Sequence, residues 1–424
     1  MRIAVIGLGH IGLPLAVQYS SRGHEVIGCD IDARVVDAVN RGESPHADEP
    51  AVVERVPPLV AAGRLRATAD DREGVGQADA VVVIVPVVVD AERRVDYGPI
   101  DAATRDVATG LQPGSLVVYE TTLPVGTTRD RLMPMLAAGS GLAPDRDFFV
   151  AFSPERVLVG RVLDDLRRYP KVVGGTSEEA TRRAVAFYRA VLEPGTEVRA
   201  LSGAEAAEMT KLAETTYRDV NIALANELAQ FAARRGLDVT EVIEAANSQP
   251  YSHLHQPGVG VGGHCIPVYP HFLIRADPGL DLPRLARDVN DGMPRWTVQR
   301  LLDALGTLRD VAVLLLGIAY RGDVREDAFS AAYPLADELG AAGARVLAHD
   351  PYFDGGDLRA RGFEPWRPEA REPVRVAVLQ AAHRAYRELR PSDIPGLELV
   401  VDGRNALAPE AWTAEGVRYV GIGR

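Results

Sequence analysis

The sequence contains few cysteines and no long apolar run. Its two cysteines, Cys29 and Cys265, are too few for the disulfide framework of a small secreted domain. The longest apolar run, residues 80–89, is shorter than the roughly 20 residues that a membrane-spanning helix needs, and Pro86 interrupts it. Arg2 leads directly into strand-like sequence, so we expect no secretory signal, no membrane association and a cytoplasmic protein.

Lysine is almost absent. The formal net charge is −12 and no basic stripe is present, which argues against a nucleic-acid-binding surface. Of the 47 basic residues, only Lys171 and Lys211 are lysines, and the others are arginines. A lysine that persists in such a chain is a candidate for a role that arginine cannot fill, because the pKa of its compact ammonium can fall on desolvation.

The first residues predict a dinucleotide site. A β-branched strand leads into GLGHIG at residues 7–12, an apolar helix follows, and a second strand ends at Asp30. This G-x-G-x-x-G turn lies between strand and helix, with an acid about 20 residues on, which is typical of NAD sites. Gly7 allows the tight turn, Gly9 lets the pyrophosphate approach, and Gly12 lets helix and strand pack closely. Asp30 would accept the ribose hydroxyls, which favours NAD over NADP; the alternative is a plain turn without a ligand.

The alternation of strands and helices predicts a doubly wound parallel sheet in each half of the chain. In the first half, further strands are expected at residues 79–85, 115–120 and 148–152. In the second half, strands are expected at residues 311–317, 345–350, 374–380 and 397–402. The second half lacks a G-x-G-x-x-G turn, so we expect no second dinucleotide site there.

Helix-favouring sequence connects the two halves. It runs from about residue 203 to Gly236, which would end the helix as a C-cap. So long a helix is suited to a spine between two domains, and it also favours a homodimer interface.

Two side chains stand out as chemical candidates. Lys211, Thr215 and Arg218 share one face of the long helix, and we favour a functional Lys211 over a solvated one. Cys265 follows a glycine-rich stretch in which the backbone could approach a ligand closely. Its thiol is either a nucleophile or a small buried apolar group, and we expect the latter for Cys29. The nearby histidines lack the spacing of a zinc site, so we expect no metal.

Seven stretches together resemble the UDP-glucose/GDP-mannose dehydrogenase family, in the family's order. They are GLGHIGLPLA, ETTLPVGTT, SPERV, KLAETTYRDVNIALANELA, GVGVGGHCIPV, DVNDGMP and RNAL with YVGIGR. SPERV and GVGGHCIPV are most similar to the UDP-N-acetylglucosamine and UDP-N-acetylmannosamine 6-dehydrogenase branch. The resemblance implies two Rossmann-like doubly wound domains joined by a helical domain with a long central helix. The implied domains are residues 1–198 for NAD, 199–300 for dimerisation and catalysis, and 301–424 for the UDP-sugar.

The resemblance also implies a reaction and its residues. The C6 hydroxyl of a nucleotide sugar would be oxidised to a carboxylate by two NAD⁺, through a thiohemiacetal and a thioester on Cys265. Lys211 would stabilise the oxyanion or move a proton, Thr122 would position water or contact the nicotinamide, and Glu155 would belong to the catalytic group. The implied substrate-binding residues are Arg156, Val157, Thr215, Arg218, Tyr251, Gly262, Tyr269, Tyr320 and Arg321. The implied cofactor-binding residues are Gly7, Gly9, His10, Ile11, Gly12, Asp30, Arg34, Pro86, Val87, Thr121 and Thr122.

Several positions depart from the family's pattern. Thr215 stands where the family has an asparagine, and Tyr269 stands where it has an aspartate. Ala328 and Tyr251 each replace an arginine, and Val87 replaces a threonine. These changes indicate an altered sugar, an altered oxidation position, or an oxidation that stops at the aldehyde. The alternatives are therefore a single two-electron oxidation or another redox step, and a non-catalytic UDP-sugar binder. Retention of Cys265 and Lys211 argues against the binder, which needs neither.

Overall fold

The computed structural model describes residues 1–46, 49–90, 92–158, 160–370 and 372–424. The chain divides into two compact units, Met1–Glu214 and Thr215–Arg424, and each is described by itself. The division falls inside α9 (Ala204–Arg235), a helix of 32 residues that has the predicted length. Gly236 follows α9 with a φ of 67°, the left-handed conformation that the predicted C-cap requires.

An eight-stranded sheet forms the centre of the first unit. Its strand order is β10-β9-β8-β7-β4-β1-β2-β3, so the part from β3 to β8 has the strand order of a dinucleotide-binding fold. Neighbouring strands are parallel except for β8 and β9. The strands are β1 (Arg2–Ile6), β2 (Glu25–Cys29), β3 (Leu65–Thr68), β4 (Ala80–Val83), β7 (Leu116–Tyr119), β8 (Phe149–Phe152), β9 (Lys171–Gly175) and β10 (Val198–Ala200). A separate antiparallel hairpin contains β5 (Val88–Val89) and β6 (Val95–Asp96).

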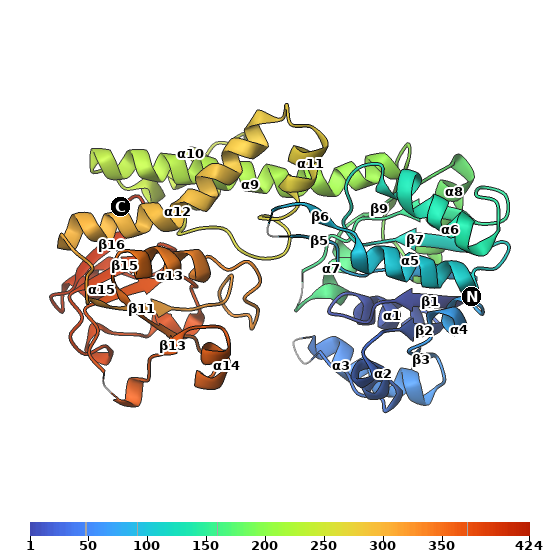
Figure 1. Ribbon diagram of the computed structural model, residues 1–424, viewed down its shortest axis with the longest axis horizontal. Coiled ribbons are helices and arrows are strands. Elements are labelled where there is room, and N and C mark those ends of the chain that lie inside the picture. Colours follow the sequence, from blue (N-terminus) through green and yellow to red (C-terminus); the bar gives the residue numbers. More distant parts are fainter. Residues whose placement is uncertain (47–48, 91, 159, 371) are drawn as a thin grey trace. The chain divides into compact units, whose positions relative to one another are not determined.

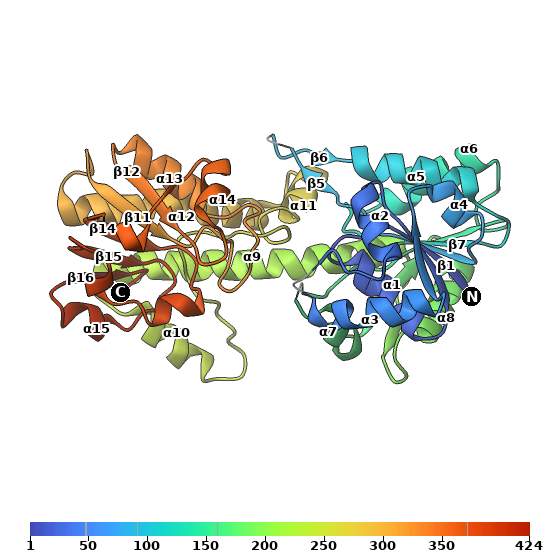
Figure 2. The same ribbon diagram turned by 90° about the horizontal axis from the view of Figure 1, so that it is seen from below.

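Helices cover both faces of this sheet. Figure 2 shows α1 (Gly12–Ser21) and α8 (Glu178–Val191) on one side of β1 and β7, and α5 (Gly98–Gly110) and α6 (Met133–Ser140) on the other. The central strands β4, β7 and β8 read as continuous apolar runs because both of their faces are buried, as in other parallel sheets. The remaining helices are α2 (Ala33–Asn40), α3 (Pro50–Ala61), α4 (Asp71–Val75), a five-residue π-helix (Thr128–Leu132) and α7 (Val162–Arg168).

A six-stranded parallel sheet forms the centre of the second unit. Its order, β13-β12-β11-β14-β15-β16, repeats the strand order of the first sheet. Val313 and Leu315 of β11 pack beneath α9, α12 and α13, whereas Leu314 and Leu316 face the core that contains Trp412 (Figure 1). The strands are β11 (Ala312–Leu316), β12 (Arg345–His349), β13 (Glu364–Pro365), β14 (Val376–Leu379), β15 (Leu399–Asp402) and β16 (Arg418–Gly421). The helices are α10 (Val239–Asn247), α11 (Pro270–Ala276), α12 (Asp281–Leu305), α13 (Ala332–Ala341), α14 (Gly355–Ala360) and α15 (Pro409–Thr413).

The acid at the end of the second strand differs between the two sheets. Asp350, which follows β12, accepts the backbone N–H groups of Ile318 and Ala319 at 2.8 and 3.1 Å. The same carboxylate is 3.0 Å from Nε2 of His383, and both side chains are buried. Asp350 is thus buried and hydrogen-bonded within the protein.

No helix in the described part of the chain has both the length and the apolar character needed to cross a bilayer.

Candidate active site

The turn between β1 and α1 has the backbone that its glycines predict. Gly7 has a φ of 94°, and a Cβ there would lie 2.6 Å from the carbonyl oxygen of Ile84. A Cβ on Gly12 would lie 1.8 Å from the carbonyl oxygen of Gly7, so helix and turn could not pack. Around Gly9, by contrast, no atom lies within 4 Å of the Cβ position. The turn is thus closed toward the sheet and open at Gly9, as pyrophosphate binding requires.

Asp30 organises this turn and keeps acceptor capacity. Its Oδ2 accepts the backbone N–H of Leu8 at 2.8 Å, and its Oδ1 accepts that of Asp32 at 2.9 Å. A carboxylate has about four lone-pair positions, so the half-buried Asp30 can still accept ribose hydroxyls. Arg34 forms an exposed ion pair with Asp32 at 2.7 Å. The neighbouring Ile31 is 95% exposed, and no motif in the sequence pointed to this apolar side chain beside the turn.

The loop after β7 is held by a buried carboxylate. Thr121 and Thr122 follow Glu120, the first residue after the strand, and are buried. Glu208 of α9 accepts the backbone N–H groups of Gly126 and Thr128 at 2.6 and 2.9 Å, and the Thr128 hydroxyl at 2.6 Å. Burial raises the pKa of Glu208 to about 7. After β4, the predicted Pro86 is exposed and Val87 is buried.

Both lysines of the chain bind Glu155, which follows β8. Lys211 Nζ donates to the backbone carbonyl of Glu155 at 2.5 Å, whereas Lys171 Nζ donates to its carboxylate at 3.2 Å. The other carboxylate oxygen accepts the backbone N–H groups of Arg156 and Val157 at 2.5 and 3.0 Å. Lys171 also donates to the buried Glu120 at 2.6 Å. The carboxylate of Glu155, which was predicted to belong to the catalytic group, thus stabilises the loop after β8 through these hydrogen bonds.

Burial and charge shift the pKa values of the two carboxyls in this cluster in opposite directions. Burial alone would raise the pKa of Glu155, but the Lys171 ammonium and the backbone N–H of Arg156 hold it below its ordinary value. The pKa of Glu120 is raised, because burial outweighs the attraction of Lys171. Burial lowers the pKa of Lys171, but Glu120 and Glu155 outweigh that effect and raise it. Of the two carboxyls, Glu155 therefore ionises more readily than Glu120, and Lys171 is the cation of the cluster.

The predicted substrate residues after β8 are engaged within the first unit. The Arg156 guanidinium forms an ion pair with Glu214 at 2.5 Å and donates to the carbonyl of Pro170 at 3.2 Å. Val157 is half-buried and packs against the core of the unit. Any contact of Arg156 with a sugar therefore uses a side chain that is already oriented by the protein.

In the second unit, a buried polar network fixes the start of the glycine-rich segment. Asn226 of α9 accepts the backbone N–H of Gly258 at 2.9 Å and donates to Asn290 of α12 at 2.8 Å. Asn290 and Arg287 in turn donate to Asp219 at 2.8 and 2.6 Å. These side chains are buried, so each hydrogen bond replaces one that water would otherwise supply.

The glycines before Cys265 are required by packing within the protein. A Cβ on Gly262 would lie 2.8 Å from Cβ of Tyr320 and 2.9 Å from the carbonyl oxygen of Phe329. Gly263 has a φ of 93° and donates its backbone N–H to the carbonyl of Ala328 at 2.9 Å. The close approach that the sequence predicted for a ligand is made here by the loop after β11.

Cys265 and Tyr269 lie one turn apart. The backbone N–H of Tyr269 donates to the Cys265 carbonyl at 2.9 Å, and the Tyr269 ring packs 5.4 Å from that of Phe272. Cys265 is half-buried, whereas Cys29 is buried and burial raises the pKa of its thiol. Cys29 is thus the inert apolar cysteine that was predicted, and Cys265 is the accessible one.

Models for all three domains of the UDP-glucose/GDP-mannose dehydrogenase family match the sequence. The NAD binding domain matches residues 1–192, the central domain residues 205–291, and the UDP binding domain residues 314–409. The chain belongs to the UDP-glucose/GDP-mannose dehydrogenase family. The predictions of an NAD-dependent oxidoreductase and of a nucleotide-sugar substrate are confirmed.

Individual relatives of this family member span its full length. A UDP-N-acetyl-D-mannosamine dehydrogenase of Pyrococcus horikoshii is 34% identical over 100% of this chain and 99% of the relative. The solved structure of the UDP-D-ManNAc dehydrogenase from Pyrococcus horikoshii has a TM-score of 0.92 at 33% identity, over 100% and 99% of the two chains. That of an NDP-N-acetyl-D-galactosaminuronic acid dehydrogenase from Methanosarcina mazei has a TM-score of 0.86 at 32% identity, over 100% and 95%. The predicted fold class is confirmed.

Within each unit, this dehydrogenase brings some predicted residues into contact and leaves others apart. In the first unit, Glu155, Arg156, Val157 and Lys211 form one cluster. In the second unit, Gly262 packs on Tyr320, whose hydroxyl accepts from Nε of Arg321 at 2.9 Å. Thr215 is buried and Arg218 is exposed, whereas Tyr251 is 92% exposed. His10 and Ile11 belong to the dinucleotide turn, where the His10 ring lies 4.3 Å from that of His46.

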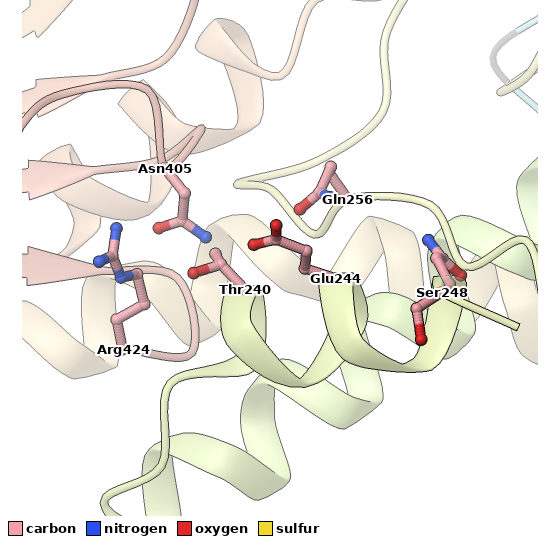
Figure 3. A pocket seen from close by; sticks show the side chains of 7 residues that line it. Thr240, Glu244, Ser248, Gln256, Asn405 and Arg424 are labelled. Carbon is pink, nitrogen blue, oxygen red and sulfur yellow. The ribbon is translucent and has the colours of Figure 1, made fainter.

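The second unit also has an open pocket of about 670 Å³ (Figure 3), which includes none of the predicted site residues. Its lining residues are Thr240, Glu244, Asn247, Ser248, Gln256, Asn405 and Arg424. Among the described residues, no three His, Cys, Asp or Glu side chains are grouped as a metal site would need.

Proposed function

We propose that the protein oxidises the C6 hydroxyl of a UDP-N-acetylhexosamine to a carboxylate, with NAD⁺ as the hydride acceptor in two steps. The observation that carries the proposal is the full-length match to all three family domains, together with a retained accessible Cys265 and a retained Lys211. The sugar is proposed from the UDP-N-acetyl-D-mannosamine dehydrogenase relative, whose sequence aligns over the whole chain.

Residues of the first unit would bind the cofactor and manage charge. NAD⁺, when bound, supplies the acceptor for each hydride from C6. The open backbone at Gly9 receives the pyrophosphate and Asp30 accepts from the ribose. Lys211 donates to an oxygen at which negative charge develops, and the Glu155 carbonyl orients its ammonium. Thr122, buried beside the loop that Glu208 fixes, contributes a hydroxyl next to the nicotinamide.

In the second unit, Cys265 would carry the covalent chemistry. Its thiolate adds to the C6 aldehyde left by the first hydride transfer, which forms a carbon–sulfur bond and an oxyanion. Loss of the second hydride from C6 converts this thiohemiacetal to a thioester. Water then attacks the thioester carbonyl, the carbon–sulfur bond breaks, and the carboxylate and the thiol are released. Tyr269 replaces the family's aspartate near this thiol, so another group must assist the attacking water.

The remaining roles and the assembly belong to the same proposal. Substrate binding by Arg156, Val157, Thr215, Arg218, Tyr251, Gly262, Tyr269, Tyr320 and Arg321 and cofactor contacts of His10, Ile11, Arg34, Pro86, Val87 and Thr121 are part of it. So are domain boundaries after residues 198 and 300, and a cytoplasmic location.

A homodimer through α9 is supported by an unusual surface stripe. Tyr217, Leu224 and Phe231 are 55%, 46% and 48% exposed and recur every seven residues, so they share one side of the helix. Large apolar side chains in such a row are typical of helix–helix interfaces. Sedimentation equilibrium of Leu224→Glu should show a monomer where the unmodified chain is dimeric.

The proposal is tested by the stoichiometry of NADH formation. UDP-, GDP- and dTDP-sugars are screened by absorbance with NAD⁺, and the product of the active sugar is identified by mass spectrometry. About two NADH per sugar and a carboxylate product support the proposal, and Cys265→Ser should abolish the product. Cys29→Ala is the matched control and should keep the activity.

Two other outcomes would contradict the proposed reaction. One NADH per sugar would establish a two-electron oxidation, which the substitutions at Thr215 and Tyr269 favour as the second candidate. Calorimetric binding of UDP-sugars without any NADH formation would establish a binding protein.

A further inference from the structure

The two lysines of the chain converge on one residue. Lys211 binds the main-chain carbonyl of Glu155, and Lys171 binds its side chain. Sequence reasoning gave a role to Lys211 alone. The geometry assigns Lys171 a role in the same reaction, and this assignment rests on the proposed function of Lys211.

Lys171 occupies a place that suits a compact ammonium. It begins β9, and its side chain is only 6% exposed. Its Nζ donates to Glu120 at 2.6 Å and to Glu155 at 3.2 Å, and it lies 4.9 Å from the centre of the Tyr188 ring. An ammonium has three donors that can diverge toward two carboxylates and a ring, whereas a planar guanidinium directs its donors in a fixed fork. This difference explains why lysine persists at this position in a chain that otherwise uses arginine.

We propose that Lys171 is a positioning residue for Lys211. Lys171 holds the Glu155 carboxylate against the backbone N–H groups of Arg156 and Val157. That arrangement fixes the loop after β8 and thereby the Glu155 carbonyl that receives the Lys211 ammonium. Lys171 itself touches neither substrate nor cofactor in this proposal.

The charged and titratable groups around Lys171 come from several elements. Glu120 follows β7, Glu155 follows β8, Tyr19 lies on α1 and Tyr188 on α8. Both tyrosine hydroxyls donate to Glu120, at 3.1 and 2.7 Å. Glu120 thus has partners other than Lys171, whereas the ionised Glu155 depends on Lys171 for its opposite charge within hydrogen-bonding distance.

Removal of the ammonium should have a consequence that depends on pH. Without Lys171, the buried Glu155 loses the main interaction that lowers its pKa, so it protonates at a higher pH. A protonated carboxyl accepts backbone N–H groups more weakly than a carboxylate. The loop should therefore loosen as the pH falls, and the carbonyl should release Lys211.

The kinetic test compares variants with the unmodified enzyme. Lys171→Met combined with Glu120→Gln removes the ammonium without leaving two buried carboxylates unbalanced. We expect kcat at pH 7 to fall about 10–100-fold, since small misplacements of a reacting group have effects of this size. The acid limb of the kcat profile should move to higher pH by about one pH unit or more, while KM for NAD⁺ changes less than twofold. Lys171→Arg keeps the charge and should leave the acid limb in place.

Arg146→Met is the matched control for loss of a basic side chain. Arg146 is 77% exposed and pairs with Asp147 on the surface of the same unit. This variant should retain both kcat and its pH profile. Circular dichroism and NAD⁺ binding verify that each variant is folded.

A second measurement does not depend on turnover. Because the chain has two lysines and Lys171 is buried, acylation by acetic anhydride reports mainly on Lys211, and peptide mass spectrometry separates the sites. In the folded double variant, Lys211 should be acylated at least three times faster than in the unmodified protein. Lys171→Arg keeps the charge but not the geometry of the ammonium, so Lys211 should be acylated more slowly there than in the double variant.

The outcomes separate this proposal from the proposed function. An unchanged acylation rate of Lys211 in the double variant overturns the positioning role, as does an acid limb that superimposes on that of the unmodified enzyme. If no sugar yields NADH, the proposed function fails, and the acylation rates still decide whether Lys171 positions Lys211.

Discussion

The buried carboxyl of Glu208 should make the stability of the first unit depend on pH. Glu208 lies on α9 and joins that helix to the loop after β7 through Gly126 and Thr128. Burial raises its pKa from an ordinary value of 4.5 to about 7. A carboxyl whose pKa is higher in the folded state binds its proton more tightly there. The contribution of Glu208 is therefore most favourable below pH 4.5, declines as the pH rises, and levels off above pH 7.

The size of this effect follows from the difference between the two pKa values. One pH unit corresponds to about 1.4 kcal/mol, so Glu208 should remove about 3 kcal/mol of stability between low and high pH. Glu208→Gln has nearly the same shape and does not titrate. Its amide must direct N–H groups at backbone donors, which costs about 1–3 kcal/mol at every pH. The variant should thus be less stable at pH 5 and lose less stability as the pH rises.

Urea unfolding at pH 5, 6, 7 and 8 measures the difference. Far-UV circular dichroism follows both units, and fluorescence identifies the transition of the second unit, because Trp296, Trp366 and Trp412 all lie there. Between pH 5 and pH 8, the free energy of unfolding of the first unit should fall about 2.5 kcal/mol less in Glu208→Gln than in the unmodified protein. Glu54→Gln, an exposed change on α3, should not alter the slope. An identical pH dependence in Glu208→Gln and in the unmodified protein would refute the reasoning.

Three further changes test the cofactor turn and the site of Cys265. Asp30→Asn should raise the Kd for NAD⁺ about 10–100-fold, because charge-assisted hydrogen bonds to the ribose are lost. An unchanged Kd in calorimetry would contradict the role of Asp30 in ribose binding. Gly12→Ala should abolish NAD⁺ binding, because the new Cβ would lie 1.8 Å from the carbonyl oxygen of Gly7. Gly292→Ala, in an open position of α12, is its control and should leave binding intact. Tyr269→Asp should speed thioester hydrolysis at least tenfold in single-turnover measurements, because it restores a carboxylate near the thiol. An unchanged rate would show that a carboxylate at position 269 does not assist hydrolysis.

Local features of the fold could be predicted from the sequence. The turn at Gly7 and Gly12 depends on neighbouring strand and helix residues, and the end of α9 at Gly236 depends on one left-handed residue. The apolar fate of Cys29 follows from its position inside a strand. In each case the determining contacts lie within or next to one element.

Contacts between distant segments could not be predicted. Lys171 meets Glu120 across 51 residues and Glu208 meets Gly126 across 82, so both depend on strand order and helix placement. The rarity of lysine did single out Lys171, but only the structure shows that it shares a partner with Lys211. The packing of Tyr320 and the carbonyl of Phe329 against Gly262, which by itself requires glycine there, also could not be predicted.

The contact between His383 and Asp350 gives the two similar sheets different roles. The two sheets repeat one strand order, yet in the second the imidazole of His383 contacts Asp350, the acid that corresponds to Asp30 of the first. Saturation with NAD⁺ should therefore reach one molecule per chain. Because Asp350 is not available to a ribose, the second sheet need not recognise a dinucleotide and can bind a different nucleotide.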